Sequence, residues 1–188
     1  MNVFDFDNTL YRGESSIDFA LYMIRINKKI ILWLPKLFWN LLKYKLCLVN
    51  RSYMEKSIND AMKRFIRSEQ EVLSLTDGFW KTHIRKLDRS MLKRIHKDDI
   101  IITAGPSFLL NGIKKHLRTS NMICSEVDLK NKCVVYLNFS DNKVRRYREK
   151  HGDKPIDCFY TDSFNDKAMM DISRNVFIVK KGKVRRIK

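Results

Sequence analysis

The stretch that decides the fold is VFDFDNTL, at residues 3–10. Its first four residues are apolar except for Asp5, and they predict a short buried strand over residues 3–6. The Asp-Asn-Thr that follows favours turns and helix caps, so the strand is expected to end there. A charged group inside an apolar run is costly unless it is paired or bound to a metal, which makes Asp5 a candidate functional residue. Because side chains alternate along an extended backbone, Asp5 and Asp7 are expected on the same side.

The segment that follows has a helical pattern up to about residue 97 and contains no strand-like run. Apolar residues recur there at three- and four-residue spacing. Ser68 and Glu71 have the form of a capping box at a helix start. Pro35 lies within a very apolar stretch and fits best at a helix start or kink. The expected helices cover residues 15–25, 52–67 and 68–87, and the apolar stretch at 30–49 lies between the first two.

Strands and helices alternate from residue 98 onward, which favours a parallel sheet covered by helices. The β-branched run IIIT at 100–103 is one of these strands. The first strand has too few neighbours to fold alone, so it is expected to join this later sheet. The other expected elements are strands at 122–124 and 156–160, helices at 107–117, 143–150 and 165–172, and hairpins within 128–139 and 176–187.

This order of elements predicts an α/β fold with one insertion. The core is expected to be a Rossmann-like, three-layer α/β/α domain with a parallel sheet, formed by residues 1–12 and 98–188. The all-helical segment 13–97 is expected to form a cap domain inserted after the first strand. A chain of 188 residues is long enough for one domain that carries such an insertion.

Four polar clusters fall where ligands bind in open parallel sheets, outside the carboxyl ends of the strands. Carboxylates gathered at one edge repel each other, and a hard divalent cation such as Mg²⁺, which prefers oxygen ligands, would neutralise them. The alternative is that these residues only cap helices and turns. The clusters are Asp5 with Asp7 and Thr9, then Thr103, then Lys143, and finally Asp162 with Asp166.

The same clusters resemble, in order, the motifs of the haloacid dehalogenase superfamily of phosphatases. DFDNTL at 5–10 resembles the Asp-x-Asp-x-Thr signature that follows a buried strand. Thr103 matches the Ser/Thr motif, Lys143 the basic motif at a helix start, and YTDSFND at 160–166 the acidic motif. The resemblance covers nearly the whole chain, because this superfamily inserts a helical C1 cap between its first two motifs.

The resemblance implies a reaction through an aspartyl-phosphate. Asp5 would be the nucleophile, and Asp7 would be the general acid and then the base that activates water. Thr103, Ala104 and Lys143 would bind the phosphoryl group and stabilise its charge.

The resemblance also implies Mg²⁺ as the cofactor. Asp5 and Asp162 would hold the ion together with the backbone carbonyl of Asp7, and Asp166 would support that site. These four aspartates are therefore the expected metal site.

Two positions depart from the usual family pattern. Thr161 stands where a glycine usually precedes the acidic motif, and Asn8 stands where glycine is common. Both change local turns rather than functional groups, so the catalytic assignment is kept. The retained Asp7 favours phosphomonoester hydrolysis, because a leaving alkoxide needs a proton.

The chain is strongly basic, since 38 Lys and Arg against 21 Asp and Glu give a formal net charge of +17. Such a charge attracts phosphates, nucleic acid or an anionic membrane surface. Residues 13–97 alone hold 18 Lys and Arg against 8 Asp and Glu. A non-enzymatic module that binds nucleic acid would leave the clustered carboxylates unexplained, so no nucleic-acid partner is expected.

The apolar and cationic stretch at 30–46 makes an anionic membrane surface a candidate partner. Three lysines and a proline argue against a spanning helix and favour an interfacial one. The alternative is a core helix of the cap. The layout resembles that of phosphatidylglycerophosphatases in the phosphoserine-phosphatase-like branch, which implies a lipid phosphomonoester as substrate. The polar residues expected on one face are Lys29, Lys36, Asn40 and Lys43.

The expected substrate is a phosphorylated lipid or small molecule, and the alternative to the lipid is a soluble, phosphoserine-like metabolite. The four cysteines have neither zinc-ligand nor disulfide spacing and are expected to be reduced thiols. No signal peptide is expected at the N-terminus. The expected location is the cytoplasm, with peripheral attachment to the inner face of the membrane if the substrate is a lipid.

Overall fold

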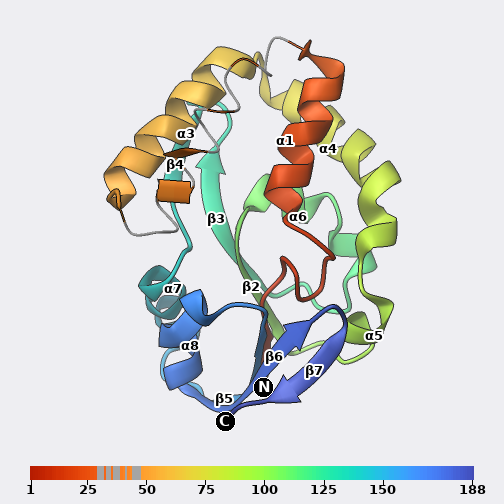
Figure 1. Ribbon diagram of the computed structural model, residues 1–188, viewed down its shortest axis with the longest axis vertical. Coiled ribbons are helices and arrows are strands. Elements are labelled where there is room, and N and C mark those ends of the chain that lie inside the picture. Colours follow the sequence, from red (N-terminus) through yellow and green to blue (C-terminus); the bar gives the residue numbers. More distant parts are fainter. Residues whose placement is uncertain (29–31, 33–34, 36–38, 41, 44–47) are drawn as a thin grey trace.

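The computed structural model describes residues 1–28, 32, 35, 39–40, 42–43 and 48–188 (Figure 1). The interfacial helix expected at 30–46 therefore lies largely outside the described residues, as does the alternative core helix. Within the described part of the chain, no helix combines the length and the apolar character needed to cross a bilayer.

The strands form one seven-stranded sheet in the order β4-β3-β2-β1-β5-β6-β7. The first strand lies at its centre and pairs in parallel with β2 and β5, which confirms that it joins the later strands. The sheet is mixed rather than wholly parallel, because β4 and β7 return as antiparallel edges. The strands are β1 (Asn2–Phe4), β2 (Ile100–Pro106), β3 (Met122–Asp128), β4 (Cys133–Tyr136), β5 (Ile156–Thr161), β6 (Ser173–Lys180) and β7 (Lys183–Arg186).

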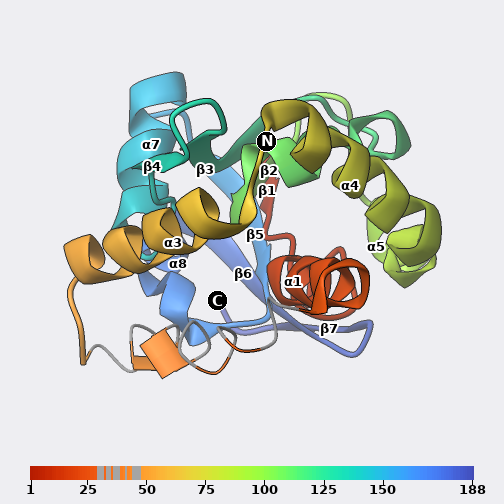
Figure 2. The same ribbon diagram turned by 90° about the horizontal axis from the view of Figure 1, so that it is seen from above.

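Helices cover both faces of this sheet, as Figure 2 shows from above. The predicted α/β class is thus confirmed. On one face the core includes side chains of α7 and α8, and on the other it includes side chains of α1, α4, α5 and α6. The helices are α1 (Ser15–Ile26), α3 (Arg51–Phe65), α4 (Glu69–His83), α5 (Arg89–Leu92), α6 (Ser107–Asn111), α7 (Asp141–His151) and α8 (Lys167–Asp171).

The central strand is apolar on both sides because both of its faces are covered. Val3 and Phe4 are fully buried, and alternation sends them into different cores. Phe4 stacks on Tyr160 of the neighbouring strand, with ring centroids 4.6 Å apart. Continuous burial on both faces explains why a three-residue strand can anchor the sheet.

In the helical segment between β1 and β2, α1 and α4 lie side by side at one end of the molecule, and α3 lies beside β4 (Figures 1 and 2). Ser68 caps α4 by accepting a hydrogen bond from the Glu71 amide, as the capping-box pattern predicts. The α3 helix also contacts the β3–β4 hairpin, and the Val134 amide donates to Asn59 Oδ1 at 2.8 Å. The helical segment therefore also packs against the sheet through α3 and the β3–β4 hairpin.

Several predicted elements differ in length from the observed ones. The helix expected at 68–87 ends at His83 and continues as a 3₁₀ turn, Ile84–Lys86. The helix expected at 107–117 is likewise divided into α6 and a 3₁₀ turn, Lys114–His116. The strand expected at 122–124 extends to Asp128 because it pairs with β4.

Candidate active site

The strand ends bring the expected site residues to one edge of the sheet. The Asp5 amide donates to the Tyr160 carbonyl at 2.8 Å, so the backbone leaves β1 beside β5. Thr103 lies within β2, on the other side of β1, and is 1% exposed. Asp162 follows β5 directly. Parallel pairing of β1 with both neighbours thus gathers residues that are far apart in sequence.

Lys143 links two of the predicted aspartates through buried ion pairs. Its Nζ lies 2.9 Å from Asp5 Oδ1 and 2.7 Å from Asp166 Oδ1. All three residues are buried, with 3% exposure for Lys143 and 7% for Asp5. The lysine comes from the first turn of α7, so this helix holds the cation against the end of β1.

One ammonium group cannot neutralise both carboxylates. Burial raises the pKa of Asp5 well above its ordinary value, Lys143 opposes this, and the charges of Asp166 and Asp7 add to it. For Lys143, burial favours the neutral form, but Asp5 and Asp166 outweigh it and raise the lysine pKa. The ammonium therefore stays charged at any physiological pH, in a site with excess negative charge.

Asp7 has the properties of a proton-transfer group. Burial raises its pKa to about 6, although a hydrogen bond from Ser15 works in the opposite direction. That bond runs from the Ser15 amide, at the start of α1, to Asp7 Oδ1 at 2.7 Å. The first turn of the helical segment thus orients Asp7, and a carboxyl group that titrates near neutrality can act as acid and base.

The departure at Asn8 fits the backbone that the structure requires there. Asn8 has a φ of 56°, in the left-handed region where glycine is favoured and asparagine is tolerated. Its side-chain amide donates to Glu14 Oε1 at 3.1 Å, and its own amide donates to the Gly13 carbonyl at 3.0 Å. Asparagine therefore closes the loop between β1 and α1.

The departure at Thr161 has a structural role that sequence reasoning missed. Its hydroxyl donates to Asp166 Oδ2 at 2.9 Å, and Thr161 is fully buried. Both Asp166 oxygens are thus engaged, one by Lys143 and one by Thr161. A threonine at this position fixes Asp166 more firmly than a glycine would.

Two further residues at the site carry no sequence motif. The negative charge of Glu14 raises the pKa values of both Asp7 and Asp162, although burial is the larger cause for each. Asn138 is fully buried, and its amide donates to the Thr103 carbonyl at 2.8 Å. Only the folded sheet brings Asn138 to Thr103, so spacing along the chain could not reveal it.

The two remaining phosphate-binding candidates are adjacent in β2. Thr103 Oγ1 accepts a hydrogen bond from the Gly105 amide at 3.0 Å. The Ala104 carbonyl accepts one from Ser125 Oγ at 2.7 Å. These contacts fix the end of β2 beside the Asp5 loop.

A sequence profile for haloacid dehalogenase-like hydrolases matches residues 3–171. The chain belongs to this family. Membership confirms the predicted superfamily and shows that the chain is a haloacid dehalogenase-like hydrolase. No curated protein sequence matches this hydrolase significantly.

Solved structures share the hydrolase fold at low sequence identity, so the likeness concerns the fold alone. A protein of unknown function from Bordetella pertussis Tohama I has a TM-score of 0.74 at 17% identity, over 94% of this chain and 87% of that one. A phosphoserine phosphohydrolase-like protein from Francisella tularensis subsp. tularensis SCHU S4 has a TM-score of 0.61 at 16% identity, over 94% and 86%. A family hydrolase from Salmonella enterica subsp. enterica serovar Typhi has a TM-score of 0.60 at 11% identity, over 91% and 58%.

The carboxylate oxygens of the site are the kind of ligand that a hard cation prefers. Asp5 and Asp166 share the buried Lys143, and burial raises the pKa values of Asp5, Asp7 and Asp162. Among the described residues, no three His, Cys, Asp or Glu side chains are yet grouped closely enough to hold an ion. A bound cation would therefore draw these carboxylates together and relieve their desolvation.

Proposed function

We propose that this hydrolase cleaves phosphomonoesters through a covalent intermediate on Asp5. A buried carboxylate held by Lys143, two residues before a carboxyl group with a pKa of about 6, is the observation that supports this proposal. Asp5 Oδ attacks phosphorus while the bond to the leaving oxygen breaks, and Asp7 gives that oxygen its proton. Asp7 then takes a proton from water, whose oxygen attacks phosphorus and releases Asp5.

The charge that develops on the phosphoryl oxygens needs fixed donors. Lys143 is charged and held in place by two carboxylates, so it requires no reorganisation during the reaction. Thr103 and Ala104, at the end of β2, are the proposed partners for the other oxygens. Their backbone is held by Ser125 and Asn138.

Mg²⁺ is the proposed cofactor, held by Asp5, Asp162 and the Asp7 backbone carbonyl, with Asp166 as support. When bound, it would supply positive charge that screens the anionic phosphate from the aspartates. Buried oxygen donors with raised pKa values support this choice.

We also propose the division into a core, residues 1–12 and 98–188, and a cap, residues 13–97, that selects the substrate. The Ser15–Asp7 hydrogen bond supports it, because it connects the first cap helix to the proposed general acid. A cap that moved would change the environment of Asp7.

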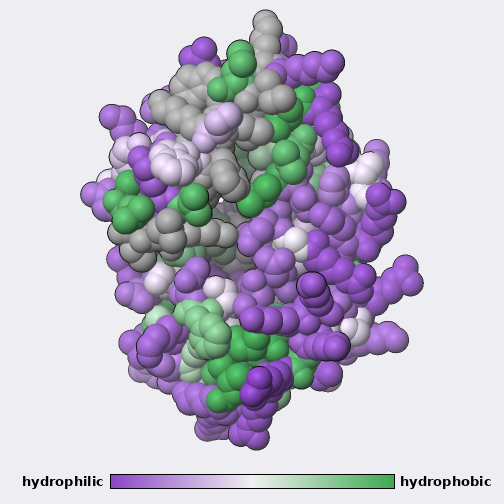
Figure 3. All heavy atoms as spheres, viewed as in Figure 1, coloured by the Kyte–Doolittle hydropathy of each residue, from purple (hydrophilic) through white to green (hydrophobic). Residues whose placement is uncertain are grey.

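A lipid phosphomonoester such as phosphatidylglycerophosphate, at the surface of an anionic membrane, is the proposed substrate. Large apolar side chains of the helical segment are exposed, among them Ile26 and Trp39 at 57% each and Leu48 at 69%. Figure 3 shows hydrophobic atoms at that end of the visible face. Lys43 lies 5.6 Å from the Trp39 ring centroid, a pairing of cation and aromatic ring that suits a lipid interface. A soluble, phosphoserine-like metabolite stays the alternative.

The decisive experiment measures Mg²⁺-dependent phosphate release from lipid and soluble phosphomonoesters. Asp5→Asn should abolish release while circular dichroism shows an unchanged fold. Asp153→Asn is the matched control, because the Asp153 side chain is 96% exposed. Turnover by Asp5→Asn would refute the nucleophile. Release from soluble esters alone, without binding to phosphatidylglycerol vesicles, would refute the lipid substrate and leave the phosphatase intact.

A further inference from the structure

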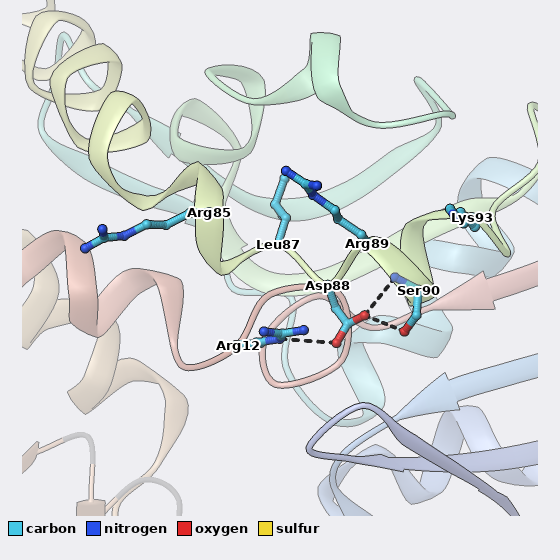
Figure 4. Close-up of a pocket in the computed structure, with 7 residues that line it drawn as sticks. All are labelled: Arg12, Arg85, Leu87, Asp88, Arg89, Ser90 and Lys93. Carbon is cyan, nitrogen blue, oxygen red and sulfur yellow. Dashed lines mark hydrogen bonds and ion pairs between the residues drawn. The ribbon is translucent and has the colours of Figure 1, made fainter.

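A second cationic site lies where the chain leaves the sheet for the helical segment and returns from it. An open cavity of about 610 Å³ is lined by Arg12 on the outgoing connection and by residues 85, 87–90 and 93 on the returning one (Figure 4). The two connections are bonded together, since the Arg12 amide donates to the Lys86 carbonyl at 2.8 Å. None of the proposed catalytic residues lines this cavity.

The lining contains four cations, Arg12, Arg85, Arg89 and Lys93, and one acid, Asp88. Both carboxylate oxygens of Asp88 already have partners. Arg12 Nε lies 3.3 Å from Oδ2, and Ser90 donates to Oδ1 through both its amide and its hydroxyl. Although burial opposes it, these donors lower the pKa of Asp88. Figure 4 shows Arg12 and Ser90 directed at Asp88, which is thus unavailable to the other three cations.

The other three cations lack an acidic partner within the described part of the chain. Arg85, Arg89 and Lys93 are exposed and form no ion pair there. Three like charges around one cavity repel each other, and nothing in the described lining offsets this. An anion would.

Two neighbouring features extend the positive charge. A Cβ atom on Gly182 would lie 3.2 Å from Asp88 Oδ2, so the β6–β7 turn, with Lys181 and Lys183, lies against this cavity. A smaller cavity of about 300 Å³ shares Arg85 and is also lined by Arg25 and Lys86. Further cations therefore lie next to the cavity, although Lys86 is paired with Asp18.

We propose that this cavity binds a phosphate-bearing anion with several negative charges, at a site separate from Asp5. Guanidinium groups match phosphate oxygens in pairs, and three arginines from two connections line this cavity. An anion bound to Arg12 and Arg89 would hold the outgoing and returning connections together. Free polyphosphates and lipid headgroups share this chemistry, and the experiment separates them.

The test compares Arg89→Gln/Lys93→Gln with Lys114→Gln/Lys115→Gln, which removes the same charge from exposed positions outside the cavity. Tripolyphosphate is titrated calorimetrically into each protein in EDTA, and phosphatidylglycerol vesicles are tested by sedimentation. Removing two cations from the site should weaken tripolyphosphate binding at least about tenfold, and the effect should shrink as salt rises. The control should change it less than about twofold.

Mapping separates this site from the catalytic one. Phenylglyoxal modifies arginines, and bound tripolyphosphate should protect Arg85 and Arg89 in the wild-type protein. Headgroup binding would instead appear as cavity-dependent sedimentation without tripolyphosphate affinity, and it supports the same site. Equal effects of the two double variants on both ligands, or absence of protection of Arg85 and Arg89 by both tripolyphosphate and the vesicles, would overturn the proposal. Because no measurement here uses turnover, failure of the anion-site proposal is distinguishable from failure of the proposed phosphatase mechanism.

Discussion

Replacing Lys143 by methionine tests the electrostatic balance of the site. At an effective dielectric constant of about 20, unit charges at the observed 2.9 Å and 2.7 Å attract by about 6 kcal/mol each. Several kcal/mol of this are offset by the desolvation of the buried ions. Breaking a buried pair and leaving the partner uncompensated typically costs 3–5 kcal/mol, so Lys143→Met should lower the free energy of unfolding by about that amount at pH 7.5.

The loss should depend on pH in a defined direction. The pKa of Asp5 is already raised, and without the lysine it rises further, so the folded state favours the protonated, neutral carboxyl group. A group with a raised folded pKa stabilises the protein below its unfolded pKa and loses that effect as pH rises through the folded value. The penalty of Lys143→Met should therefore shrink between pH 7.5 and pH 5.

Urea unfolding in EDTA, followed by circular dichroism at both pH values, measures this penalty. Lys150→Met removes an exposed lysine from the same helix and should change stability by less than about 0.5 kcal/mol. A penalty for Lys143→Met that is absent, or equal at pH 5 and pH 7.5, would refute the reasoning.

Two other predictions concern Asp7 and Thr161. Asp7→Asn should lower kcat for an alkyl phosphate by about 10²- to 10⁴-fold. It should lower kcat much less for p-nitrophenyl phosphate, whose leaving group needs no proton; equal losses would exclude Asp7 as the acid. Thr161→Val leaves buried Asp166 Oδ2 without its hydroxyl donor and should cost about 1–3 kcal/mol in urea unfolding. Thr161→Ser keeps that donor, so a serine variant as unstable as the valine variant would contradict the assigned hydrogen bond.

The central features of the fold could be predicted because burial leaves a strong pattern. An apolar β1 that holds one carboxylate can be stable only inside a sheet, and parallel pairing with β2 and β5 then brings Asp5, Thr103 and Asp162 to one edge. Element lengths were harder to predict, since they depend on tertiary partners. The β3 strand extends to Asp128 because β4 pairs with it.

The finer connections of the site could not be predicted from spacing. Whether Lys143 contacts Asp5, Asp166 or both depends on how α7 packs on the sheet, and local sequence does not encode that position. The Ser15–Asp7 bond likewise depends on the left-handed turn at Asn8, which directs the start of α1 back toward the strand. Motifs specify which groups are present, whereas loop conformation determines which of them meet.

The distribution of charge explains why strongly basic and strongly acidic regions occur in one molecule. Surface cations raise the local concentration of phosphate-bearing ligands at long range, but that field is screened by salt within about 10 Å. In the buried site the balance is reversed, because Asp5, Asp7, Asp162 and Asp166 outnumber Lys143. A phosphate attracted to the surface would be repelled there unless further positive charge entered with it. The basic surface and the proposed metal-binding carboxylates would therefore be complementary: the surface would concentrate the anion, and the carboxylates would make its reaction conditional on a cation.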